Sequence, residues 1–246
     1  LAGQYDVDLV GDSLATLAGA LSLRLEPSEI DGMRIASGAA RVRFDQGIMQ
    51  VDTLELESVP GTLRAHGVLG LTRAPGADSL VVAFDVDSLG GLRRYLRSTT
   101  TLTGKLPRPD SLRGSLAFRG SARGWLDSLD LRGTLFGREL YMNGNLAHVL
   151  NGSLAVRSVG GHTTGTVGVR ADTLVAGGVK VRSANFDAHL LDRGHARFGI
   201  GALTNNDATL RAAGDWLSLA DTMHVKLDTA TLAVGDGAND FEMIKA

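Results

Sequence analysis

Residues 109–140 read PDSLRGSLAFRGSARGWLDSLDLRGTLFGREL, and this stretch decides the fold class. It holds successive copies of a unit that begins at an aspartate or serine turn, continues as a leucine-led strand and ends at a glycine. The phrase DSL begins at residues 12, 78, 87, 110 and 127, DTL at 52 and 172, and LRG or FRG at 112, 118 and 131. A short repeat that cannot bury its own apolar side stacks against its neighbours, so we expect an elongated sheet of degenerate repeats.

Alternation of apolar and polar residues extends this pattern over the whole chain. It predicts half-buried strands at 21–26, 51–57, 167–170, 179–182 and 224–228. Hairpin turns are expected at the following phrases: Asp45-Gln46-Gly47, Asn143-Gly144, Asn151-Gly152, Gly177-Gly178 and Asp192-Arg193-Gly194. Because a turn recurs about every ten residues, we expect on the order of twenty short strands in a meander.

The composition agrees with an all-β chain. Of 246 residues, 32 are glycine and 5 are proline, and glycine this frequent is unfavourable inside helices. Short helices are expected only at 88–98, at 215–219 and over the last six residues. With 25 basic and 27 acidic side chains, the net charge is −2, which gives no reason to expect a nucleic-acid partner, because such binding needs a clustered positive face. The absence of cysteine excludes disulfides, thiolate metal sites and thiol nucleophiles.

The repeat phrases and glycine closures between about Leu9 and Gly235 resemble the AsmA and TamB family of bacterial envelope proteins. The resemblance implies an elongated, curled antiparallel sheet whose apolar inner side forms an open groove. It implies a non-enzymatic protein without cofactors, serving phospholipid transport between membranes or outer-membrane protein assembly. Implied partners are phospholipid acyl chains, an outer-membrane assembly protein, and the inner and outer membranes. The chain begins at Leu1 without a signal peptide, so we expect a fragment of a periplasmic protein that is anchored to the inner membrane through a segment outside it.

A second resemblance concerns residues 232–246, LAVGDGANDFEMIKA. They resemble the fourth motif of haloacid-dehalogenase-type phosphatases, particularly phosphoserine phosphatases, in which an apolar strand ends in GDGxND. In that family Asp236 and Asp240 would be ligands of Mg²⁺, a cation that prefers carboxylate oxygens. We therefore separate a β-repeat region at 1–231 from a tail at 232–246 whose motif does not belong to the repeats.

The other phosphatase motifs have matches of unequal quality. Residues 81–88, VVAFDVDS, resemble the first motif, with Asp85 as nucleophile and metal ligand and Asp87 as general acid and base. The best candidates for the serine and lysine motifs are Ser158 and Lys180. However, the phosphatase fold needs crossover helices between parallel strands, and residues 89–232 offer glycine-broken strands instead.

Three functions therefore remain open at the level of sequence. We expect an all-β envelope groove protein, with a Mg²⁺-dependent phosphatase as the alternative and a structural β-repeat spacer as the second alternative. An apolar side that closes on another sheet as a sandwich or barrel core would favour the spacer. An open, curled sheet would favour transport.

Overall fold

The computed structural model describes residues 2–30, 33–73, 79–91, 112–159, 162–192, 194–219 and 222–234. These residues form fifteen β-strands in a single sheet. The strands are β1 (Gly3–Val10), β2 (Ala18–Leu25), β3 (Ser28–Ile30), β4 (Met33–Asp45), β5 (Ile48–Ser58), β6 (Gly61–Gly70), β7 (Ser79–Val86), β8 (Leu112–Trp125), β9 (Ser128–Met142), β10 (Asn145–Val159), β11 (Thr164–Ala176), β12 (Val179–Asp192), β13 (His195–Thr204), β14 (Thr209–Leu219) and β15 (Thr222–Ala233).

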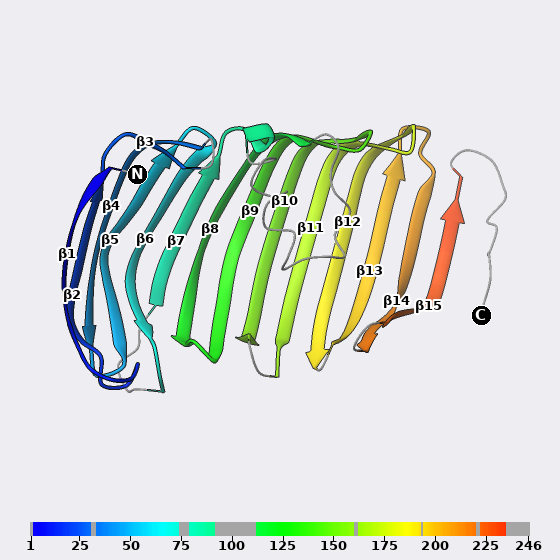
Figure 1. Cartoon of the computed structure of the whole chain (residues 1–246). Helices are drawn as coiled ribbons and strands as arrows, with labels where there is room; N and C mark the ends of the chain where they lie inside the picture. Colours follow the sequence, from blue (N-terminus) through cyan, green and yellow to red (C-terminus); the bar gives the residue numbers. More distant parts are fainter. Residues whose placement is uncertain are drawn as a thin grey trace.

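The sheet is an antiparallel meander in which strands that follow one another in sequence lie side by side. Only β3 lies outside this order, because it pairs with the start of β4 while β2 pairs with the rest of it. Figure 1 shows β1 and β15 at opposite ends of the sheet, which curls without closing into a barrel. The expected all-β, curled antiparallel sheet is therefore confirmed, and the sandwich and barrel alternatives do not describe this arrangement.

Most of the expected hairpin turns connect strands. The Asp45-Gln46-Gly47 phrase lies at the β4–β5 turn, Asn143-Gly144 joins β9 to β10, and Gly177-Gly178 joins β11 to β12. Gly144, with φ of 85°, adopts the left-handed conformation that a tight hairpin turn requires. The five strands expected from alternation fall within β2, β5, β11, β12 and β15.

Three expectations about local structure were wrong, and two others lie partly or wholly outside the described residues. Asn151-Gly152 lies inside β10 rather than in a turn, and residues 215–219 belong to β14 rather than to a helix. The strands reach fifteen residues in β9 and β10, so fifteen long strands replace the expected twenty short ones. The expected helix at 88–98 begins with helical residues at 89–91, and its remainder, like the helix expected over the last six residues, lies outside the described residues.

The sheet has no second layer among the residues that the structure describes. None of their side chains is completely enclosed, and the chain exposes 16025 Å² of surface. A compact monomer of this length would expose about 10,500 Å². Many large apolar side chains of the described strands therefore remain exposed, Ile200 and Trp216 at 39% among them.

Candidate functional site

The strand register sorts the side chains of the whole sheet onto two faces. Residues directly opposite each other in neighbouring strands point to the same side, so the pairing can be followed from β1 to β15 as a row. The middle row contains Tyr5, Leu23, Ala40, Leu54, Ala65, Val82, Gly120, Gly133, Leu154, Val167, Ala188, Phe198, Gly214 and Leu227. Every residue of this row is apolar or glycine.

The rows on either side of the middle row on the same face have the same character. One contains Val7, Leu21, Val42, Val51, Gly67, Leu80, Ala122, Leu131, Val156, Gly165, Leu190, Ala196, Trp216 and Val225. The other contains Gly3, Leu25, Gly38, Leu56, Leu63, Phe84, Phe118, Leu135, Gly152, Val169, Phe186, Ile200, Ala212 and Ala230. These three rows define what we call the apolar face, and none of their members is charged.

The opposite side, which we call the polar face, carries the charged and hydrogen-bonding residues. The row that lies between the middle row and the Ile200 row along the strands contains Gln4, Arg24, Ala39, Glu55, Arg64, Ala83, Arg119, Thr134, Ser153, Gly168, Asp187, Gly199, Ala213 and Thr229. The two faces therefore differ in polarity across the entire width of the sheet.

Bulges keep the apolar face continuous where the sequence breaks its alternation. Val51 and Leu54 are three residues apart, yet both lie on the apolar face because the register shifts between them. A second shift lies between Ala213 and Gly214 and brings Leu227 and Ala230 to the same face. A β-bulge adds one residue to one strand of a pair and so restores the phase of the alternation.

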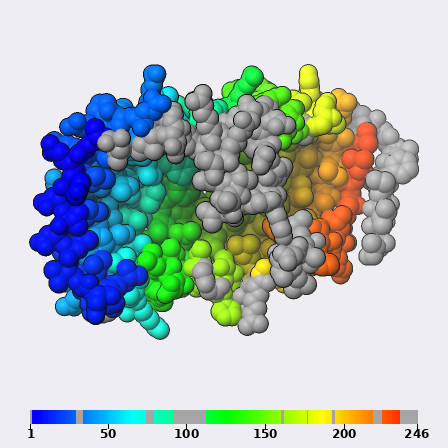
Figure 2. Space-filling model, viewed as in Figure 1, coloured from blue at the N-terminus to red at the C-terminus, as the bar shows by residue number. Residues whose placement is uncertain are grey.

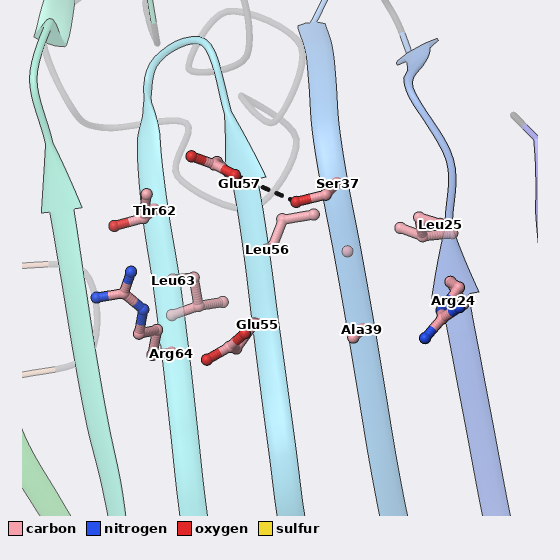
Figure 3. Close-up of a pocket in the computed structure, with 11 residues that line it drawn as sticks. Arg24, Leu25, Ser37, Ala39, Glu55, Leu56, Glu57, Thr62, Leu63 and Arg64 are labelled. Atoms are coloured by element: carbon pink, nitrogen blue, oxygen red, sulfur yellow. Dashed lines mark hydrogen bonds between the residues drawn. The ribbon is translucent and has the colours of Figure 1, made fainter.

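The apolar face is the hollow side of the sheet. Figure 3 looks onto the polar face, where Arg24 of β2 lies to the right of Arg64 of β6. In Figure 1 β2 lies to the left of β6, so Figures 1 and 2 view the opposite, apolar face. Figure 2 shows the middle strands set back behind β1 and β2. The apolar face thus lines an open trough, in which Val42 is 6% exposed but Ile200 is 39% exposed.

Aromatic rings and glycines shape the floor of this trough. The rings of Phe84 and Phe118 stack with centroids 5.3 Å apart, and those of Phe186 and Phe198 stack at 6.5 Å. A Cβ atom added to Gly133 would lie 2.5 Å from Cζ of Phe118. The Phe118 ring consequently lies against the backbone of its neighbouring strand, where only glycine leaves room for it.

Ion pairs neutralise much of the charge on the polar face. The guanidinium of Arg43 donates from Nε and Nη2 to the two carboxylate oxygens of Asp52, at 3.0 and 2.7 Å. These hydrogen bonds lower the pKa of Asp52 below its ordinary value. The depression drawn in Figure 3 also balances its charges, with Arg24 and Arg64 against Glu55 and Glu57.

The structure does not gather the phosphatase candidates into one site. Asp85 points to the polar face, where Nη2 of Arg119 donates to its two oxygens at 2.8 and 2.7 Å. Asp87 directly follows the last residue of β7. Ser158 lies at the end of β10, which is at the other edge of the sheet along the strand direction, and its N–H donates to Asp130 Oδ1 at 3.1 Å.

Lys180 is exposed near the start of β12. With strands about 4.8 Å apart, five strand spacings place it roughly 24 Å from β7. Asp236 and Asp240 lie outside the described residues. Within the described ranges, no group of His, Asp and Glu side chains comes together that could hold a metal ion, Mg²⁺ included.

The alternation of apolar and polar residues already indicates the apolar face, even where the same residues resemble a phosphatase motif. In residues 81–88 the alternation itself places Val82 and Phe84 on the apolar face and Asp85 on the polar face. The same alternation at Ala196, Phe198 and Ile200 predicts the strand that follows the turn phrase at 192–194. When the alternation of apolar and polar residues is also followed through β6–β9, β13 and β14, it identifies nearly all residues of the apolar face.

No helix in the part of the chain that the structure describes is long and apolar enough to cross a membrane. Comparison of the chain with protein-family models, with curated proteins and with solved structures finds no match. The candidate site therefore rests on its own geometry, an open apolar trough whose three rows of described residues contain no charged side chain.

Proposed function

We propose that this protein is a non-enzymatic groove protein of the bacterial cell envelope that binds phospholipid acyl chains and carries them between membranes. The observation that carries the proposal is the apolar face, whose three rows cross all fourteen consecutive strands without a charged side chain. Exposed apolar patches larger than a few hundred Å² are uncommon on soluble monomers and mark binding surfaces. The resemblance of the repeat phrases to the AsmA and TamB family supports the periplasmic setting.

The energetics of the trough suit an acyl chain better than a compact polar ligand. Each methylene removed from water contributes about 0.8 kcal/mol, and a surface made mostly of Leu, Val, Ala, Gly and Phe offers few polar groups that would fix a single position. An acyl chain that leaves a bilayer for the trough exchanges one apolar environment for another. The trough can therefore hold a lipid without a high barrier to its movement.

The dimensions of the trough fit the same role. Fourteen strands about 4.8 Å apart give it a length of roughly 60 Å, about twice the hydrocarbon thickness of a bilayer. The polar face stays in water along this whole length. Headgroups can remain in solvent at the open side of the trough while the acyl chains lie against the apolar rows.

Binding of a phospholipid with a fluorescent acyl chain tests the proposal through two matched substitutions. Ile200 lies on the apolar face and Val81 on the polar face, and both are 39% exposed. We expect Ile200→Asp to weaken lipid binding at least tenfold, because a carboxylate in contact with an acyl chain loses hydration without gaining a partner. Val81→Asp should leave binding unchanged.

Native mass spectrometry of the purified chain supplies the second measurement. Bound phospholipid is expected in the wild type and in Val81→Asp, and not in Ile200→Asp. Absence of phospholipid from the wild type, together with no uptake from vesicles, would refute the proposal and favour a structural spacer. An equal loss of binding in both variants would also contradict it, because the loss would then not depend on the face.

A further inference from the structure

The two outermost strands that the structure describes, β1 and β15, lie at opposite ends of the sheet. Among the described residues, β1 pairs only with β2 and β15 pairs only with β14. All eight residues of β1 are exposed, and β1 contains no proline that would block pairing. An open edge with free N–H and C=O groups is a ready template for another strand.

The number of strands determines what can be added at these edges. Fourteen strands follow one another in antiparallel order from β1 to β15, so β1 and β15 run in opposite directions. A second copy of the chain, displaced along the sheet without rotation, therefore brings its β1 antiparallel to the β15 of the first copy. Its apolar and polar faces then lie on the same sides as those of the first copy.

We propose that β15 of one molecule pairs with β1 of a second copy, so that the sheet continues from one molecule to the next. In the register that continues the apolar rows without a step, Tyr5 lies opposite Leu227 and Val7 lies opposite Val225. The whole of β1, Gly3–Val10, then lies opposite residues 222–230, all of which belong to β15, with Asp228 as the extra residue of the bulge. The apolar trough becomes continuous across the junction.

The charges of the two edges select this same register. It places Asp6 opposite Lys226 and Asp8 opposite His224 on the polar face, and opposite charges on facing strands stabilise a pair. A shift of two residues in one direction keeps Lys226 opposite an aspartate, Asp8, but brings Asp6 opposite Asp228. A shift in the other direction leaves the uncharged Gln4 opposite Lys226. Pairing of two β1 strands with each other would bring Asp6 and Asp8 of one copy close to those of the other. The charges thus favour β1 with β15 and disfavour β1 with β1.

The contact joins the β15 edge of one molecule to the β1 edge of another. A pair of molecules therefore still has one β1 edge and one β15 edge that can take part in further contacts. Such a head-to-tail contact extends into open rows unless its rotation closes a ring. The association needs no lipid, so it goes beyond the proposed function and can be tested without it. The expected solution behaviour is a mass that rises with protein concentration.

Sedimentation equilibrium of the full chain at low ionic strength tests the pairing with edge variants. Lys226→Glu makes the facing positions 6 and 226 both acidic, and the double substitution Asp6→Lys with Asp8→Lys makes these facing positions both basic. We expect each variant alone to weaken self-association roughly tenfold, because like charges then face each other. An equimolar mixture of the two variants should associate again, since every acidic edge finds a basic edge. Lys180→Glu, which makes the same charge change away from both edges, should associate like the wild type.

Three results would overturn the proposal. The first is a monomeric wild type over the whole soluble concentration range. The second is association that none of the edge substitutions weakens, which would indicate contact through the apolar face. The third is a mixture of the two edge variants that remains as monomeric as either variant alone. Circular dichroism of each variant verifies that its sheet is intact, so that a loss of association is not a loss of folding.

Discussion

Substitution of Gly133 by alanine tests whether the floor of the trough is built as the structure describes it. The added Cβ would lie 2.5 Å from Cζ and 2.6 Å from Cε2 of Phe118, and 3.0 Å from the carbonyl oxygen of Arg119. Ordinary contacts of a Cβ lie at 3.4–4 Å. The Phe118 ring must therefore move by about 1 Å, away from the sheet and into the open trough.

The expected magnitude is the balance of two effects. Overpacking of a fitted site costs about 1–3 kcal/mol, whereas replacing glycine by alanine stabilises by about 0.4–1 kcal/mol through the unfolded chain. We expect Gly133→Ala to lower the free energy of unfolding by about 1–2 kcal/mol. The Phe118 ring contributes most of this cost, because it supplies the two nearest atoms.

Urea denaturation followed by circular dichroism measures this change against a matched control. Gly199 also lies within a strand, but a Cβ added there would meet no atom within 4 Å. Gly199→Ala should therefore raise the free energy of unfolding by about 0.4–1 kcal/mol. In a Phe118→Ala background, Gly133→Ala should no longer destabilise the protein. Equal free energies of unfolding for Gly133→Ala and Gly199→Ala would refute the reasoning.

Two further predictions concern the polar face. Because Arg43 lowers the pKa of Asp52 in the folded protein, this pair stabilises the fold above the unfolded pKa of about 4 and is lost as the pH falls through the folded pKa. Asp52→Asn should thus lose less of its stability than the wild type in an acid titration followed by circular dichroism, and an unchanged acid midpoint would contradict this. Asp130→Ala removes the acceptor of the Ser158 N–H at a bulge and should lower the free energy of unfolding by about 1–2 kcal/mol, as measured by urea denaturation. Asp130→Asn keeps an acceptor and should lower it by less. Equal losses of stability in the two variants would exclude a role for this hydrogen bond.

The fold class could be predicted from local patterns, whereas the register could not. Alternation at 21–26 and 51–57 identifies strands because side chains of a strand point alternately to its two sides. Asn151-Gly152 has the composition of a turn, yet both residues pair on both sides within β10. Gly152 pairs directly with Leu135 of the neighbouring strand β9, and a Cβ added to this glycine would lie 3.2 Å from the Cβ of Leu135. Close approach between strands explains this glycine, and such an approach is not visible in one segment of sequence.

The candidate site could be predicted as a kind of surface but not as a set of residues. One apolar and one polar face follow from alternation alone. The members of each row depend on bulges, such as the one that brings Val51 and Leu54 to the same side. The interpretation of Asp85 as a nucleophile relied on its neighbours in sequence, whereas its partner in the sheet is Arg119 of the next strand. Tertiary pairing therefore supplied the information that local motifs lack.

The single layer of strands has a consequence for how this protein can lose its structure. Each strand is held chiefly by the two strands beside it, so the stability resembles that of a linear array with nearest-neighbour coupling. The end strands β1 and β15 have one neighbour each, whereas β9 and β10 have two neighbours and fifteen residues over which to pair. Unfolding can then begin at either end and stop partway. A molecule that has lost its outer strands still keeps a shorter trough in its middle.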